Sequence, residues 1–229
     1  MTAAIHITPT APLAERVLLP GDPGRALMLA QTLLYQPRMF NHNRGLWGYT
    51  GIASDGDPLT IQSTGMGGPS AAIVLFELAQ LGARRVIRVG TCGTLDASLE
   101  LGALVIAREA MAADGTSAAL GAGDRTAADP ELLGALVRAG TAPAQTVVSA
   151  DLFYDDDARR QERWRAAGAV AVEMECAAIY ALASKLGLSG AAVLTVSDLL
   201  RPQRARIDPN SLRAAERRMG ELALRALTG

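Results

Sequence analysis

The stretch STGMGGPSAAIVLFEL, from Ser63 to Leu78, decides how the rest of the chain is interpreted. An apolar run ends at Ser63, a glycine-rich turn follows, and Pro69 stands where the first turn of a helix would begin. A strand, a glycine loop and a helix in this order are typical of α/β folds. In GxGxxG the third glycine is replaced by Ser70, and no acidic residue follows about 20 positions later to hold a ribose. The pattern disfavours a dinucleotide loop and leaves a plain tight turn as the alternative.

Outward from this stretch, short apolar runs bounded by glycine or aspartate alternate with longer amphipathic segments, which predicts an α/β domain. We expect one domain over 1–229 and regard 112–129 and the run RPQRARIDP, 201–209, as loops. The expected strands are 16–19, 47–53, 59–63, 85–89, 103–107, 145–149, 169–172 and 191–197, and the expected helices are 25–34, 69–81, 175–186 and 211–227.

Composition excludes several classes of function. With 22 basic and 23 acidic residues the net charge is -1, so no global field attracts nucleic acid or an anionic membrane. Lys185 is the only lysine and lies near an expected helix end, which disfavours Schiff-base chemistry. Cys92 and Cys176 form no CxxC pair and only two histidines are present, which disfavours zinc. With no signal peptide and no long apolar run, we expect a cytoplasmic protein without metal or cofactor.

Two clusters could hold an anion. In LLPGDPGR, a strand ends at Gly21 and Arg25 opens a helix, so backbone N–H groups and a guanidinium could converge, although a β-turn with a solvated arginine is the alternative. In VIRVGTCGT, Arg88 stands inside an apolar strand. Burying a guanidinium is costly unless it is paired, so the sequence predicts a buried anionic partner for Arg88.

Two further clusters carry carboxylates. In VAVEMECAAIY, Glu173 and Glu175 could accept hydrogen bonds from sugar hydroxyls or could cap the following helix. In VLTVSDLL, Ser197 and Asp198 end an apolar strand. Asp198 could be a helix N-cap or a general acid in a dry pocket.

Together with HNRGLWGYTG and SADLFY, these clusters occur in the order and at the spacing of one family. The chain resembles the nucleoside phosphorylase family, which includes bacterial purine nucleoside phosphorylases and uridine phosphorylases. The resemblance implies a three-layer α/β/α sandwich around a mixed, partly barrel-like sheet. It also implies assembly of copies, with a dimer as the minimal active unit and a hexamer built as a trimer of dimers.

The resemblance also implies roles for individual residues. Phosphate would be held by Gly21, Arg25, Arg88 and Thr91, with Arg44 from a neighbouring subunit. Ribose would be held by Met66, Met174 and Glu175, with His6 from the neighbour. The base would be lined by Phe153, Tyr154, Ser197 and the backbone around Cys92, Gly93, Val172 and Glu173. Asp198 would face N7 of the base as the general acid, assisted by Arg217 or alternatively by Arg213 or Arg218.

An aspartate at 198 resembles the branch that cleaves both 6-amino and 6-oxo purine nucleosides. The expected activity is reversible phosphorolysis of purine ribo- or deoxyribonucleosides, a pentosyl transfer used in purine salvage, with inorganic phosphate as co-substrate. The QER run from Gln161 to Arg163 is similar to the glutamine and arginine of uridine phosphorylases, but it stands too close to VEMEC, so we expect a helix surface there. The alternatives are uridine phosphorylase, methylthioadenosine phosphorylase or nucleosidase, another hydrolytic nucleosidase, and a nucleoside-binding protein without turnover.

Overall fold

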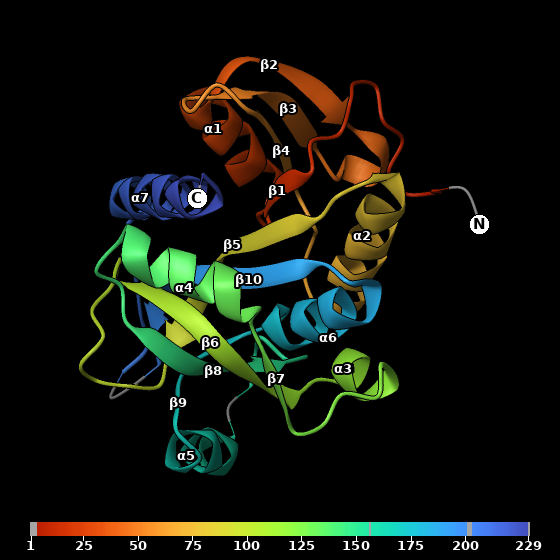
Figure 1. Cartoon of the computed structure of the whole chain (residues 1–229). Coiled ribbons are helices and arrows are strands. Elements are labelled where there is room, and N and C mark those ends of the chain that lie inside the picture. Colours follow the sequence, from red (N-terminus) through yellow and green to blue (C-terminus); the bar gives the residue numbers. More distant parts are fainter. Residues whose placement is uncertain (1–3, 156, 201–202, 229) are drawn as a thin grey trace.

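The computed structural model describes residues 4–155, 157–200 and 203–228. Within these residues, 11 strands join in one mixed sheet (Figure 1). Five of the strands close into a ring, because β10 pairs with β5 on one side and with β6 on the other. The ring consists of β5 (Arg85–Thr94), β10 (Ser189–Leu199), β6 (Leu104–Ala113), β8 (Ala144–Ala150) and β9 (Ala169–Glu173).

From β5 the sheet continues as an open extension at the N-terminal end of the chain. β1 lies parallel to both β5 and β4, and β3 and β2 follow in antiparallel order. A short 3-10 turn, η1 (Asn43–Gly45), joins the last two. The bounds of these strands are β1 (Arg16–Leu19), β4 (Pro58–Gln62), β3 (Gly48–Ala53) and β2 (Leu34–Asn41).

Helices cover both faces of the sheet. One layer holds α1 (Pro23–Leu33), α4 (Pro130–Ala139) and α7 (Pro209–Leu227), and the other holds α2 (Gly68–Leu81), α3 (Gly115–Ala119) and α6 (Cys176–Leu186). α6 and α7 both pack against β10, which is buried along nearly its whole length between them (Figure 1). The expected sandwich with a barrel-like mixed sheet is therefore confirmed.

Aspartate–proline steps set where three of these helices begin. Asp22, Asp129 and Asp208 are the N-caps of α1, α4 and α7, and each carboxylate accepts a backbone N–H bond from the first turn. A proline follows each cap, at the position where the missing N–H costs nothing. The local sequence thus fixes the ends of helices whose apolar sides pack on the sheet.

Every expected strand and helix is present, but α4 forms where no helix was expected, and three further regions differ from expectation. β2 was not expected, because it contains Pro37 and five consecutive exposed residues, so its sequence lacks the alternation of a half-buried strand. The expected loop 112–129 holds α3, which Asp114 caps through Ser117, and β7 (Arg125–Ala127), which pairs with β6. RPQRARIDP holds β11 (Ala205–Arg206), and its first two residues lie outside the described ones.

A bulge near the end of β10 sets the direction of the side chains that follow it. Val196 pairs with Cys92 of β5, whereas the next pairing joins Asp198 to Gly93, so Ser197 is an extra residue in β10. β11 then pairs antiparallel with β10, with Arg206 opposite Asp198.

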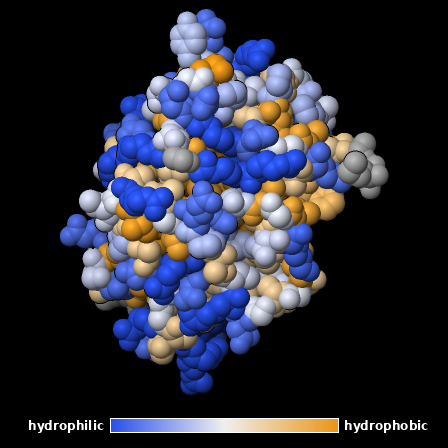
Figure 2. All heavy atoms as spheres, in the orientation of Figure 1, coloured by the Kyte–Doolittle hydropathy of each residue, from blue (hydrophilic) through white to orange (hydrophobic). Residues whose placement is uncertain are grey.

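The surface is mixed in character. Figure 2 shows a face on which hydrophilic residues are interspersed with small apolar areas. In the part of the chain that the structure describes, no helix has the length and apolar character needed to cross a membrane.

Candidate active site

A cavity of about 190 Å³ opens where β5, β9 and β10 end. Twelve of the site residues expected from the sequence line it: Met66, Arg88, Thr91, Cys92, Gly93, Phe153, Val172, Glu173, Met174, Glu175, Ser197 and Asp198. The sequence analysis did not assign the remaining lining residues to the site: Leu152, Asp155, Gln161, Trp164, Leu200 and Arg204. The structure thus brings most of the expected residues to one place.

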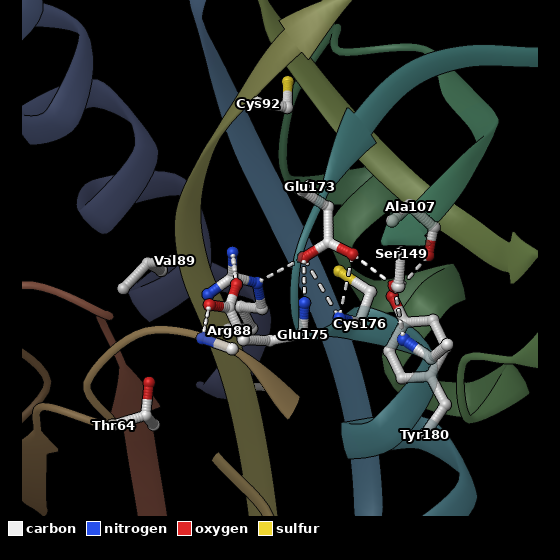
Figure 3. A network of polar contacts seen from close by, with 12 residues as sticks. Thr64, Arg88, Val89, Cys92, Ala107, Ser149, Glu173, Glu175, Cys176 and Tyr180 are labelled. Carbon is white, nitrogen blue, oxygen red and sulfur yellow. Dashed lines mark hydrogen bonds and ion pairs between the residues drawn. The ribbon is translucent and has the colours of Figure 1, made fainter. Parts of the chain in front are cut away.

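Arg88 of β5 lines one end of this cavity, and its side chain is 4% exposed. Its Nε donates to Glu173 Oε2 at 3.0 Å, and its Nη2 lies 2.5 Å from Glu175 Oε2 (Figure 3). Burial alone would lower the pKa of Arg88, but the Glu175 and Glu173 carboxylates outweigh it and raise the pKa. The buried anionic partner predicted for Arg88 is therefore supplied by this chain's own glutamates.

Glu173 caps the start of α6 from the end of β9. Its carboxylate accepts the backbone N–H groups of Glu175 at 2.9 Å and Cys176 at 3.0 Å, and it also accepts the Ser149 hydroxyl (Figure 3). The Glu173 side chain is fully buried, at 0% exposure. Of the two roles considered for Glu173, helix capping is the one observed.

Glu175 joins the glycine loop to Arg88. Its Oε1 accepts the backbone N–H of Gly67 at 2.5 Å, and Gly67 adopts φ 85° and ψ 159°, a conformation that suits glycine. Burial raises the pKa of the Glu175 carboxyl, and the Arg88 guanidinium opposes that rise. The glycine loop therefore serves to present a backbone donor to a buried carboxylate.

The other end of the cavity is formed by Asp198, which is 4% exposed. Its Oδ2 accepts the Ser197 hydroxyl at 2.7 Å, while its Oδ1 is buried without a hydrogen-bond partner among the described residues. Arg204 Nη2 lies 3.5 Å from Oδ1, and Arg206 Nε lies 3.6 Å from it. Asp198 belongs to β10, so the interpretation of Asp198 as a helix N-cap is wrong.

The aromatic ring of Phe153 forms part of the cavity wall. Phe153 and Tyr154 meet edge to face with ring centres 5.0 Å apart, and the Arg204 guanidinium lies 5.0 Å from the centre of the Phe153 ring. Tyr154 itself does not line the cavity and is 86% exposed.

Gly21 and Arg25 lie next to the cavity rather than in its wall. Arg25 Nε donates to Glu216 Oε1 of α7 at 2.7 Å, and its Nη1 donates to the carbonyl of Val89 at 3.3 Å. Arg25 is thus held beside the residue that follows Arg88, and the alternative of a solvated turn arginine is wrong.

Three expected residues lie away from the cavity of their own chain. His6 Nδ1 is 2.7 Å from Glu77 Oε1 of α2, Arg44 is exposed in η1 with φ 57°, and Arg217 is exposed on α7. Gln161 lies on a helix as expected, α5 (Ala158–Ala166), but it is a cavity-lining residue and not a free surface. Its Nε2 donates to the Asp155 carbonyl at 3.1 Å.

Comparison with known proteins places this chain in a family. Residues 15–228 match the model of the phosphorylase superfamily. A DeoD-type purine nucleoside phosphorylase of Geobacillus kaustophilus (strain HTA426) is 39% identical over 204 residues, which cover 85% of this chain and 86% of that protein. A protein of the same name from Clostridium beijerinckii (strain ATCC 51743 / NCIMB 8052) is 39% identical with the same coverage. The crystal structure of uridine phosphorylase from Vibrio fischeri ES114 matches with a TM-score of 0.84 at 26% identity, over 94% of this chain and 92% of that one. The chain belongs to the phosphorylase superfamily.

Proposed function

We propose that the protein is a purine nucleoside phosphorylase. It transfers the pentosyl group of a purine ribo- or deoxyribonucleoside to inorganic phosphate, releasing the free base and pentose 1-phosphate. The observation that carries this proposal is one cavity with the Arg88–Glu175 pair at one end and, at the other, Asp198 Oδ1, which accepts no hydrogen bond from the described residues. The similarity to purine nucleoside phosphorylases supports it.

Phosphate and ribose bind at the Arg88–Glu175 end of the cavity, and the base binds at the Asp198 end. Phosphate binds near Arg88 and Thr91, with Gly21 and Arg25 behind them, and the ribose hydroxyls bind Glu175 beside Met66 and Met174. Fixed cations position the attacking phosphate without reorganisation when the bond to C1′ forms. The positive charge of Arg88 next to the Glu175 carboxylate therefore places the nucleophile beside the sugar.

The base lies between Phe153 and Val172, and Asp198 protonates N7 as the bond to C1′ breaks. Without that proton the purine departs with a full negative charge. General-acid catalysis accelerates such a step by roughly 10²–10⁴-fold, on the order of 3–5 kcal/mol. Because Asp198 Oδ1 is free of hydrogen bonds among the described residues, it is available to the base.

Substrate range and assembly follow from the same residues. An aspartate at 198 serves both 6-amino and 6-oxo purines. The positions of His6 and Arg44, outside the cavity of their own chain, fit a dimer in which each serves the neighbouring subunit, within a hexamer built from three dimers. The chain acts as one cytoplasmic domain, 1–229, in purine salvage, with phosphate as its only co-substrate.

Turnover of adenosine and inosine, with and without phosphate, tests the proposal. We expect free base and ribose 1-phosphate from both nucleosides, only when phosphate is present. Base release at the same rate after phosphate is rigorously removed would instead show a hydrolytic nucleosidase. Asp198→Asn should impair adenosine cleavage far more than inosine cleavage, and equal losses would contradict the general-acid role.

One observation favours a second candidate, a uridine phosphorylase. Gln161 lines the cavity, where its amide could bind a pyrimidine, and a uridine phosphorylase has the same fold. Phosphate-dependent cleavage of uridine but of neither purine nucleoside would establish this alternative.

A further inference from the structure

A groove adjoins the cavity on the side of α5. It runs between that helix and residues 94–101, at and after the end of β5. Its volume is about 1150 Å³, compared with about 190 Å³ for the cavity, so it has room for a group as large as an aromatic ring. Five leucines make up most of its apolar lining: Leu95, Leu99, Leu101, Leu199 and Leu200. The groove therefore suits an apolar group.

The wall between the cavity and the groove contains two described residues, Gln161 and Leu200, which line both. The Gln161 amide is fixed by a hydrogen bond, because its Nε2 donates to the Asp155 carbonyl at 3.1 Å. The Leu200 side chain is held by packing, against the small apolar cluster that includes Leu95 and Trp164. Leu200 thus closes its part of the wall by its volume alone.

Leu200 lies beside Asp198 on the same side of the strand. Asp198 pairs with Gly93 of β5 and Leu199 with Thr94, with no further bulge, so the side chains of Asp198 and Leu200 point to one side. A Cβ on Gly93 would lie 3.2 Å from the Leu200 side chain, so Leu200 lies against the backbone opposite Asp198. Leu199 points to the other side and packs against the main core.

We propose that Leu200 is a specificity-determining residue that limits the size of the substituent on C6 of the purine. The inference rests on the proposed phosphorolysis, in which N7 of the base faces Asp198. N7 and the C6 substituent share one edge of a purine, so this edge turns the substituent toward the wall at Leu200. An amino or oxo group fits in front of the wall, whereas an arylalkylamino group overlaps the Leu200 side chain. Once that side chain is shortened, the groove behind it holds the larger group.

Phosphorolysis of N6-benzyladenosine and of adenosine, compared as a ratio of kcat/KM values, tests this inference. In the wild-type protein the benzyl compound should be at least about 100-fold poorer, because a packed pocket rejects even one extra methylene by about 10–200-fold. Leu200→Ala should narrow the difference at least about tenfold, and Leu200→Val, which removes one carbon, about threefold. Leu199→Ala is the matched control, because Leu199 lines the groove but not the cavity, and it should leave the ratio within about twofold of the wild-type value.

Both substrates are measured on the same enzyme, so a loss of folded protein in any variant cancels in the ratio. Should Leu200→Ala not fold, Leu200→Val carries the test. A crystal structure of the Leu200 variant with N6-benzyladenine should show the benzyl ring in the groove, and a ring turned away from the groove would overturn the inference.

Three kinetic results would also overturn it: wild-type protein that cleaves N6-benzyladenosine as well as adenosine, an unchanged ratio in the Leu200 variants, or an equal gain in Leu199→Ala. In each case the cleavage of adenosine still supports the proposed function. Wild-type protein with no phosphate-dependent cleavage of a purine nucleoside would instead overturn the proposed function and this inference together.

Discussion

Glu173→Gln removes one negative charge from the floor of the cavity while keeping almost the same side-chain volume. The Glu173 carboxylate accepts the Arg88 guanidinium, the Ser149 hydroxyl and the N–H groups that begin α6. Each partner is a donor, and a glutamine amide offers one acceptor oxygen and an NH₂ group that donates. In either orientation of the amide, NH₂ faces a buried donor.

The loss in the free energy of unfolding caused by Glu173→Gln can be estimated from these contacts. A buried donor left unpaired costs about 1–3 kcal/mol, and breaking a buried ion pair by removing one partner costs about 3–5 kcal/mol. Arg88 retains Glu175, at 2.5 Å, as a second anionic partner, so we expect a total near the lower end, about 3 kcal/mol. For a chain of this size about 2–4 °C is lost per kcal/mol, which predicts a melting temperature lower by about 6–12 °C.

Thermal unfolding followed by circular dichroism measures this loss. Glu109→Gln is the matched control, because Glu109 also accepts two side-chain hydrogen bonds, from Thr146 and Arg125, but its side chain is 26% exposed. A partly solvated pair contributes about 1 kcal/mol or less, so the control should lose no more than about 4 °C. Equal losses in the two variants would refute the view that burial of the Glu173 network stabilises the fold.

Three further predictions concern residues that do not themselves line the cavity. Burial raises the pKa of the Glu77 carboxyl, but hydrogen bonds from His6 and the backbone outweigh it and hold the pKa below its usual value. The stability that Glu77 contributes is thus present above about pH 4.3 and is lost as the pH falls through the folded pKa. Hydrogen exchange of the backbone amides of residues 5–7, corrected for intrinsic rates, should therefore accelerate from pH 6 to pH 3. Unchanged protection of these amides would contradict this prediction. Glu216→Gln removes the charge that pairs with Arg25 and should raise KM for phosphate about threefold to tenfold in steady-state assays. A rise in KM for the nucleoside instead would refute the view that Glu216 positions Arg25 for phosphate. Gly67→Ala forces a side chain into a glycine conformation and should cost about 1–3 kcal/mol in chemical denaturation, whereas a neutral result would show that the loop relaxes.

The sequence was most informative where local chemistry determines structure. Buried strands such as β5 and β10 were predicted because their apolar runs end at glycine or aspartate, and α2 because Pro69 marks its first turn. β2 was not predicted because its pairing with β3 stabilises it, while its own sequence has no strand pattern. The strand also contains bulges and a positive φ at Gln36. A strand that depends on pairing with its neighbour, and whose own residues show no strand pattern, leaves no local signal of this kind.

The same distinction applies to the site. A buried anion beside Arg88 was predictable from the cost of an unpaired guanidinium, but not that Glu173, 85 residues later, would supply it. Gln161 was assigned to a surface because α5 is polar. The helix packs through Trp164, which is 9% exposed, and this orientation places Gln161 in the cavity wall. Arg204 could not be assigned because its position depends on the pairing of β11.

The extra residue in β10 makes the site sensitive to insertions and deletions as well as to substitutions. Successive side chains in a strand point to opposite faces, so losing Ser197 would remove the offset and rotate Asp198 away from its present direction. The same deletion would shift the register that joins β10 to β11 and would carry Arg206 and Arg204 with it. Any redesign of this enzyme by loop grafting must therefore preserve the residue count between Val196 and Ala205, because backbone length there sets the direction of the Asp198 carboxylate.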